Sequence, residues 1–126
     1  MKNINQTQQQ DTPEVIFDNE KKILKISGNS YPENCEIIYE PINIFLNEYN
    51  LNKNHKLNFE FRFNLINSTS TVYLAQIIMK IAQLNSEGLI VTILWYYDEF
   101  DEELLDLGEK LSSISNLPFT FTPVRD

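Results

Sequence analysis

Hydrophobic and polar residues alternate without a break over residues 57–65. The apolar members of this segment are Leu57, Phe59, Phe61, Phe63 and Leu65. A period of two predicts a β-strand with one buried and one solvated face. A parallel strand covered by helices on both faces would instead be apolar throughout. The segment therefore predicts a sheet that carries its helices on one side only.

Three segments have the apolar spacing of helices. The first follows a capping box formed by Ser30 and Glu33 and contains Pro41, which should kink or split the helix. The second, from about residue 68 to 84, is apolar around most of its circumference and should be central to the core. The third places its apolar side chains on one face: Phe100, Leu104, Leu107, Leu111 and Ile114.

Short apolar runs at 15–17 and 23–26 predict a hairpin, and segments 89–95 and 119–122 predict two later strands. The predicted order is β-β-α-β-α-β-α-β. Right-handed crossovers then give mostly parallel pairing and place all the helices on the same face. The predicted fold class is α/β, a small two-layer sandwich with a mixed, mostly parallel sheet.

Composition limits the remaining possibilities. Residues 1–11 are polar and rich in glutamine, which predicts a disordered tail, and residues 12–126 have the length of a single domain. The net charge of −8 argues against nucleic acid and anionic membranes as partners and favours other proteins. A single cysteine, no segment near the roughly 18 apolar residues of a membrane span and no apolar run at the start predict a cytoplasmic protein.

Few residues are suited to catalysis. Cys35 and His55 are of the nucleophile and base types, but their sequence contexts are those of an amphipathic helix and a solvated loop. The acidic run at 98–103 contains no glycine and is interrupted by Phe100, unlike a calcium loop. It suits either a solvated helix start or a partner-docking patch. With no glycine-rich phosphate loop, we expect no nucleotide-dependent chemistry, and we also expect no cofactor and no metal. An enzyme would need a concave pocket with convergent polar groups, which the sequence does not reveal.

Four consecutive hydroxyl residues, Ser68 to Thr71, stand between the alternating strand and the apolar second helix. Such residues at a helix N-terminus can cap the helix, bind an anion or accept a phosphate. Thr69 continues the outward polar stripe of Tyr73, Gln76 and Lys80. A phosphate here would add about −1.5 to −2 charge and alter partner binding rather than folding.

Several segments resemble the SiaC family of regulatory phosphoproteins, which is similar to the STAS domains of anti-sigma factor antagonists. The resemblance spans about residues 12–122. Its segments are Thr12 to Val15 with Phe17-Asp18, Ser27-Gly28 with Ser30 to Asn34, Phe63 to Ser70, Trp95 with Tyr97 to Glu99 and Gly108-Glu109, and Leu117 to Phe119.

The resemblance implies a STAS-like domain that binds partners and has no catalytic activity. The implied partners are a kinase of the anti-sigma-factor type, a PP2C-type phosphatase and an effector such as a diguanylate cyclase. The resemblance also implies that the phosphoacceptor is the residue after Asn67, here Ser68, and that Asn67 and Ser70 shape the junction. Thr69, on the outward polar stripe, is the second choice. The candidate partner-binding residues are Tyr31, Glu33, Asn34, Tyr97, Asp98, Glu99 and Asp101. The alternative is a constitutive binding or scaffold domain of the same fold without phosphorylation.

Overall fold

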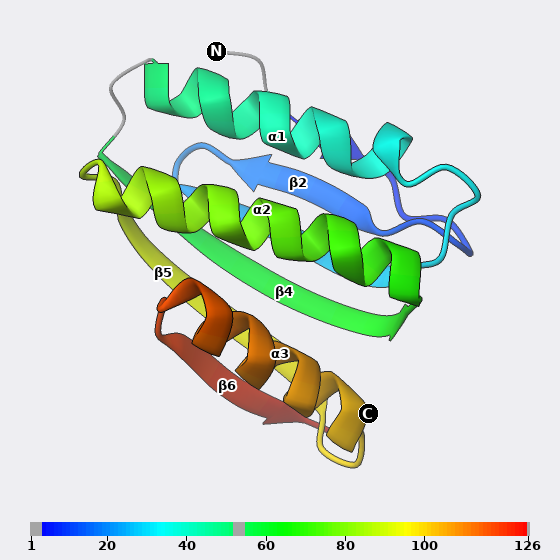
Figure 1. The fold of residues 1–126 in the computed structure, drawn as a ribbon. Helices are drawn as coiled ribbons and strands as arrows, with labels where there is room; N and C mark the ends of the chain where they lie inside the picture. The colour runs from blue at the N-terminus through cyan, green and yellow to red at the C-terminus, as the bar shows by residue number, and fades with distance from the viewer. Residues whose placement is uncertain (1–3, 52–54, 126) are drawn as a thin grey trace.

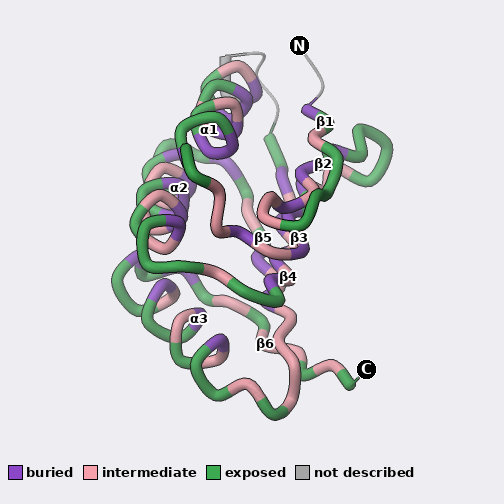
Figure 2. Tube along the Cα trace, turned by 90° about the vertical axis from the view of Figure 1, so that its right-hand side faces the viewer, coloured by how far each residue is buried: buried purple, intermediate pink, exposed green. Residues whose placement is uncertain are grey.

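A computed structural model describes residues 4–51 and 55–125 as one six-stranded sheet with three helices on one of its faces (Figures 1 and 2). The elements are β1 (Asn5–Gln6), β2 (Glu14–Asp18), β3 (Ile23–Ser30), α1 (Glu36–Leu51), β4 (Lys56–Ile66), α2 (Ser68–Ser86), β5 (Ile90–Asp98), α3 (Glu102–Ser115) and β6 (Phe119–Val124). None of the helices in the described ranges is long and apolar enough to cross a membrane.

The strands lie in the order in which they occur in the sequence. β1, β2 and β3 pair antiparallel, whereas β3, β4, β5 and β6 pair parallel. Each parallel connection passes through a helix on the same face, as the one-sided polarity of β4 predicts (Figure 2). The α/β fold class is therefore confirmed. The carboxyl ends of β3, β4, β5 and β6 consequently meet at one edge, which we call the carboxyl edge of the sheet.

The core lies between the sheet and its helices. Leu57, Phe59, Phe61 and Phe63 are buried, as the alternation predicts, and the Phe61 ring lies 5.8 Å from that of Trp95 on β5. Leu65 was expected on the same face but is 60% exposed. Gly28 pairs with Phe63 and Ser30 with Ile66, so β4 has one residue more than β3 over this stretch. A bulge of this kind reverses the alternation after Phe63.

The start of α1 differs from the prediction. Ser30 is the buried last residue of β3 and caps no helix, so the Ser30–Glu33 capping box is wrong. Instead, Asn34 Oδ1 accepts a hydrogen bond from the Glu36 backbone N at 3.1 Å. Pro41 does not split α1, which continues to Leu51. Burial of the apolar face of α1 against the sheet offsets the hydrogen bond that the proline lacks.

Several apolar side chains in and before the other two helices are more exposed than predicted. α2 lies between α1 and α3 (Figure 1), and its side away from the sheet leaves Val72 57% and Met79 46% exposed. Phe100 was expected on the buried face of the third helix but is 82% exposed, and Ile114 is 50% exposed. Asp101 caps α3, so the helix begins after Phe100 and does not bring that ring onto its apolar face.

Residues 4–11 differ from the disordered tail expected over 1–11. Asn5 and Gln6 form β1 on the edge of β2, Ile4 is buried, and the Phe17 backbone N donates to the Ile4 carbonyl at 3.2 Å. The exposed backbone groups of an edge strand explain this pairing, because even a polar segment can satisfy them. Residues 1–3 lie outside the described residues.

Candidate functional site

Three loops that carry candidate site residues meet at the carboxyl edge. Residues 31–35 follow β3, the hydroxyl run follows β4, and residues 99–101 follow β5. The Asn67 backbone N donates to the Ser30 carbonyl at 3.0 Å, which joins the first loop to the second. Thr71 and Asp101 line the same hollow, of about 240 Å³, which joins the second loop to the third. Parallel topology thus brings together segments that are distant in the sequence.

The β4–α2 junction is capped by an asparagine. Asn67 has extended backbone angles, φ −85° and ψ 171°, and its Oδ1 accepts a hydrogen bond from the Ser70 backbone N at 2.8 Å. Its carbonyl accepts two more, from the Thr71 backbone N and the Thr71 hydroxyl, both at 3.0 Å. The hydroxyl run is therefore not needed for capping, since Asn67 already performs that role.

The four hydroxyls have different environments. Ser70 is completely buried, and Thr71 donates to the Asn67 carbonyl. Ser68 and Thr69 are both exposed, and within the described residues no side-chain hydrogen bond engages either hydroxyl. Both lie at the positive end of the α2 dipole, where a negative charge is stabilised. Ser68 and Thr69 are therefore the two exposed residues of the run, whereas Ser70 is buried and Thr71 is half-buried.

A buried polar cluster lies beneath the junction. Ser30 Oγ is 2.7 Å from the Tyr39 hydroxyl and donates to Ser70 Oγ at 2.9 Å, and Cys35 Sγ is 3.5 Å from Ser70 Oγ. Burial raises the pKa of Tyr39 to about 12, so its hydroxyl keeps its proton even at pH 10.0, the ordinary pKa of tyrosine. Sequence reasoning missed Tyr39. The signal was a tyrosine beside the apolar stripe of a helix, since a buried tyrosine hydroxyl needs a partner.

The β5–α3 loop uses its carboxylates locally. Asp98 Oδ1 accepts from the Phe100 backbone N at 2.9 Å, and Asp101 Oδ1 accepts from the Leu104 backbone N at 3.0 Å. Glu99 pairs with Arg125 at 2.6 Å. Within residues 4–51 and 55–125, no group of three or more histidine, cysteine or carboxylate side chains is placed to hold a metal ion.

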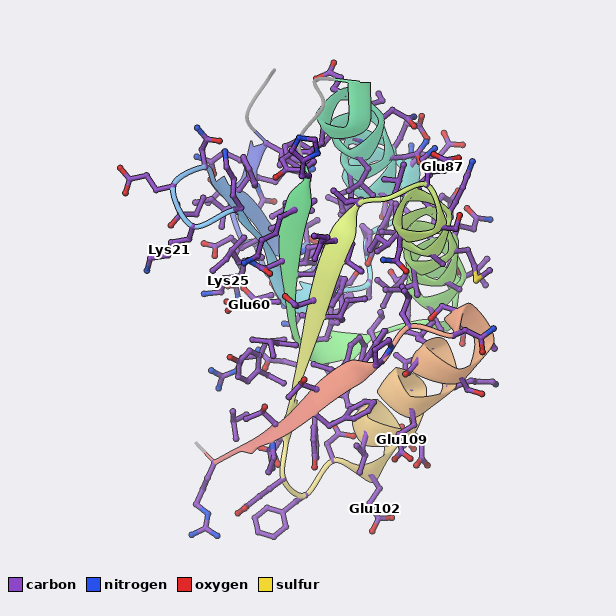
Figure 3. The ribbon with its side chains drawn as sticks, turned by 90° about the vertical axis from the view of Figure 1, so that its left-hand side faces the viewer. Lys21, Lys25, Glu60, Glu87, Glu102 and Glu109 are labelled. Carbon is purple, nitrogen blue, oxygen red and sulfur yellow. The ribbon has the colours of Figure 1, made fainter. Side chains whose placement is uncertain are left out.

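A groove of about 510 Å³ runs beside this loop. Its lining combines four carboxylates with Arg62, Asn64 and apolar side chains, so negative charge predominates. Asn64, Asp101, Glu103 and Leu104 also line the smaller hollow that reaches Thr71. Glu102 and Glu109 project outward from α3 (Figure 3). The two hollows therefore form a continuous acidic depression from the first turn of α2 to the exposed ring of Phe100. We call this depression the acidic groove.

The other candidate residues divide between the edges of the sheet. Glu33 and Asn34 are exposed in the β3–α1 loop, and Tyr31 and Tyr97 are half-buried at the same edge. Cys35 is buried at the carboxyl edge, whereas His55 is exposed just before β4, at the opposite edge. The structure therefore does not bring Cys35 and His55 together as a nucleophile and base.

Comparisons with known proteins agree on the family. A family model described as SiaC family regulatory phosphoprotein matches residues 4–124. The chain is 24% identical over 110 residues to the uncharacterized protein PA14_02130 of Pseudomonas aeruginosa strain UCBPP-PA14, covering 87% of each.

Solved structures share the fold. Apo-SiaC from Pseudomonas aeruginosa matches with a TM-score of 0.87 at 21% identity, over 97% of this chain and 99% of that one. A structure of the diguanylate cyclase SiaD in complex with its activator SiaC, from the same organism, matches with a TM-score of 0.89 at 21% identity, over 96% and 99%. The match to the family model covers nearly the whole chain, and the chain therefore belongs to the SiaC family of regulatory phosphoproteins.

Proposed function

We propose that this protein is a non-catalytic binding module in the cytoplasm that phosphorylation at the β4–α2 junction switches between partners. The observation that carries the proposal is the contrast within the hydroxyl run. Ser68 and Thr69 are exposed at the N-terminus of α2, whereas Ser70 is buried. Ser68, which directly follows the cap Asn67, is the proposed acceptor, and Thr69 is the second choice.

The proposed partners are proteins. An effector of the diguanylate cyclase type is supported by the structural likeness to a complex of SiaD with its activator SiaC. A kinase of the anti-sigma-factor type and a PP2C-type phosphatase are proposed from the family resemblance. The net charge of −8 supports protein partners over nucleic acid or an anionic membrane.

The physical basis of the switch is charge at the carboxyl edge. A phosphate on Ser68 adds about −1.5 to −2 charge next to a groove that already contains several carboxylates. An acidic partner surface docked over the junction would then be repelled. An apolar partner surface would have to remove water from the phosphate, which is unfavourable. Because Ser68 is exposed and α2 presents its positive end, the fold itself tolerates the phosphate.

The proposed partner surface surrounds this junction. It combines the acidic groove with the neighbouring β3–α1 loop. Its residues are Tyr31, Glu33, Asn34, Tyr97, Asp98, Glu99 and Asp101.

The first experiment is phosphorylation by the cognate kinase, followed by intact-mass measurement and peptide mapping. We expect one phosphate on Ser68 or Thr69 in the natural protein, and none in the Ser68→Ala/Thr69→Ala double variant. Single variants identify which of the two accepts it. Modification confined to residues outside 68–71, or no modification at all, would refute the proposal.

The second experiment measures binding of the cyclase effector by calorimetry. Ser68→Asp should weaken binding while Ser68→Ala retains it. Ser113→Asp supplies a matched charge control, because Ser113 is exposed in the last turn of α3, at the other edge of the sheet. Equal affinities for Ser68→Asp and Ser68→Ala would instead identify a constitutive scaffold.

A further inference from the structure

Ser30 contacts both ends of the segment that holds the exposed hydroxyls. Its carbonyl accepts from the Asn67 backbone N at 3.0 Å, and its hydroxyl donates to Ser70 Oγ at 2.9 Å. Asn67 and Ser70 are themselves joined, because Asn67 Oδ1 accepts from the Ser70 backbone N at 2.8 Å. Ser68 and Thr69 are the two residues between these bound positions. They therefore form a two-residue arch with both ends attached to the end of β3.

The donor and the acceptor of each hydroxyl contact beneath the arch can be assigned. Ser30 has a single hydroxyl hydrogen and donates it to Ser70, so the 2.7 Å contact with Tyr39 requires Tyr39 to be the donor. The Ser70 hydroxyl hydrogen is then free to point toward Cys35 Sγ, 3.5 Å away. Tyr39 is protonated at neutral pH, as any tyrosine is, and burial raises its pKa further, to about 12. In such a chain each hydrogen bond polarises the next.

All four members of this hydrogen-bond chain are buried. Ser30 and Ser70 are 0% exposed, Tyr39 is 1% exposed and Cys35 is 4% exposed. No buried side-chain nitrogen or oxygen in the described residues lacks a hydrogen-bond partner. Removal of the Ser30 hydroxyl takes one buried partner from Tyr39 and one from Ser70. Such a loss is costly in a dry environment.

We infer that Ser30 and Tyr39 are positioning residues for the phosphoacceptor. They hold the Ser68–Thr69 arch in one conformation and keep the hydroxyl of Ser70 below the surface, where a kinase cannot reach it. The inference rests on the proposed function for the identity of the acceptor. The geometry of the arch does not depend on it. The hydrogen-bond chain also connects the first turn of α1 to the first turn of α2, because Tyr39 lies in the former and Ser70 in the latter.

Amide hydrogen exchange tests the inference without any partner. The informative amides are those of Ser70 and Thr71, which are bonded to Asn67. Ser30→Ala removes the Ser30 hydroxyl and both of its contacts, and should speed exchange at these amides by about tenfold or more. Tyr39→Phe removes only the hydroxyl that donates to Ser30 and should speed exchange at these amides by about threefold.

Tyr49→Phe is the matched control for Tyr39→Phe. Tyr49 is also a buried tyrosine of α1, but its hydroxyl donates to the Lys56 carbonyl, far from the arch along the helix. This variant also loses one tyrosine hydroxyl contact, to a backbone carbonyl, and should leave exchange at Ser70 and Thr71 unchanged. A purely global loss of stability would affect the amides in both variants alike.

Peptide mapping after kinase treatment supplies the second readout. In the natural protein we expect no phosphate on Ser70, whereas Ser30→Ala should allow measurable modification there, because the hydroxyl loses its buried partner.

The outcomes separate the inference from the proposed function. Unchanged exchange at Ser70 and Thr71 in Ser30→Ala, or an equal change in Tyr49→Phe, would overturn the inference. Phosphate on Ser70 of the natural protein would also overturn it. An absence of any phosphorylation combined with the expected exchange pattern would refute the proposed function and leave the positioning role of Ser30 standing.

Discussion

The indole ring of Trp95 lies directly against the backbone of Gly108. A β-carbon at position 108 would be 2.6 Å from Trp95 Nε1, closer than real β-carbon contacts. The ring cannot easily move, because Trp95 is 1% exposed and its Nε1 donates to the Leu104 carbonyl at 3.0 Å. The absence of a side chain at Gly108 allows α3 to approach β5 closely. This close packing positions α3, and the first turn of α3 lines the acidic groove.

Gly108→Ala should therefore destabilise the protein. The added methyl group overpacks a rigid site, which costs about 1–3 kcal/mol and exceeds the helix propensity gained over glycine, at most about 1 kcal/mol. Urea unfolding measures the change. Ser113→Ala, at an exposed position of the same helix, is the control and should change the free energy of unfolding by less than about 0.5 kcal/mol. A Gly108→Ala protein as stable as the natural one would contradict the close packing.

Aspartate substitutions should distinguish the buried from the exposed serine of the junction. Ser68→Asp places a carboxylate in solvent at the N-terminus of α2 and should leave stability unchanged or raise it by up to about 1 kcal/mol. Ser70→Asp places a charge where exposure is 0%, and should lower the free energy of unfolding by about 3 kcal/mol or prevent folding. Chemical denaturation of both variants is the measurement, and equal stabilities would show that Ser70 is not buried in solution.

Stability should fall in alkaline solution. Burial raises the pKa of Tyr39 to about 12, and burial also raises the pKa of Tyr49. Below about pH 10 both tyrosines are neutral in the folded and unfolded states, and the pH has no effect through them. Between about pH 10 and 12 the unfolded chain ionises Tyr39 while the folded protein does not, so unfolding becomes more favourable as pH rises.

For Tyr39 alone the slope approaches about 1.4 kcal/mol per pH unit within that window. Urea unfolding at pH 9 and pH 11 measures it. Tyr39→Phe should show a smaller loss between the two pH values, because phenylalanine does not ionise. The same loss in both proteins would exclude Tyr39 as the source.

Phe100 should contribute to partner binding and not to stability. Its side chain is 82% exposed and lines the acidic groove. Phe100→Ala should change the free energy of unfolding by less than about 0.5 kcal/mol, whereas a truncated aromatic anchor weakens binding by about tenfold or more. Ile90→Ala is the control, since Ile90 is 62% exposed at the opposite edge of the sheet. Equal effector affinities of the natural and Phe100→Ala proteins would place the partner surface elsewhere.

In the alternating strand, the local pattern predicts the burial of most residues but not the exposure of Leu65. Burial of Phe59, Phe61 and Phe63 follows from a period of two, which needs only local backbone geometry. The exposure of Leu65 depends on a bulge, and the bulge arises from the register between β3 and β4. Register depends on a segment more than thirty residues away, so no reading of residues 57–65 alone reveals it.

The junction shows the same division. A strand followed by hydroxyl residues and an apolar run predicts a helix start near residue 68, and α2 begins at Ser68. The sequence does not distinguish Ser70 from its neighbours, because its burial results from Ser30 and Tyr39 on other elements. Ser30 itself was expected to cap a helix, since a serine three residues before a glutamate has the same local appearance whether it ends a strand or begins a helix.

By itself, then, the sequence determined the α/β class, the one-sided sheet, the absence of familiar catalytic motifs and the resemblance to the SiaC family. These properties are carried by periodicity, composition and short motifs, all of which are local. The outward position of Thr69 also followed from helical periodicity. Tertiary structure alone decided that Ser70 is buried, that Phe100 is exposed, and that three loops meet at one edge. The physical reason is that burial depends on what packs above a residue, and the packing partner comes from a different part of the chain.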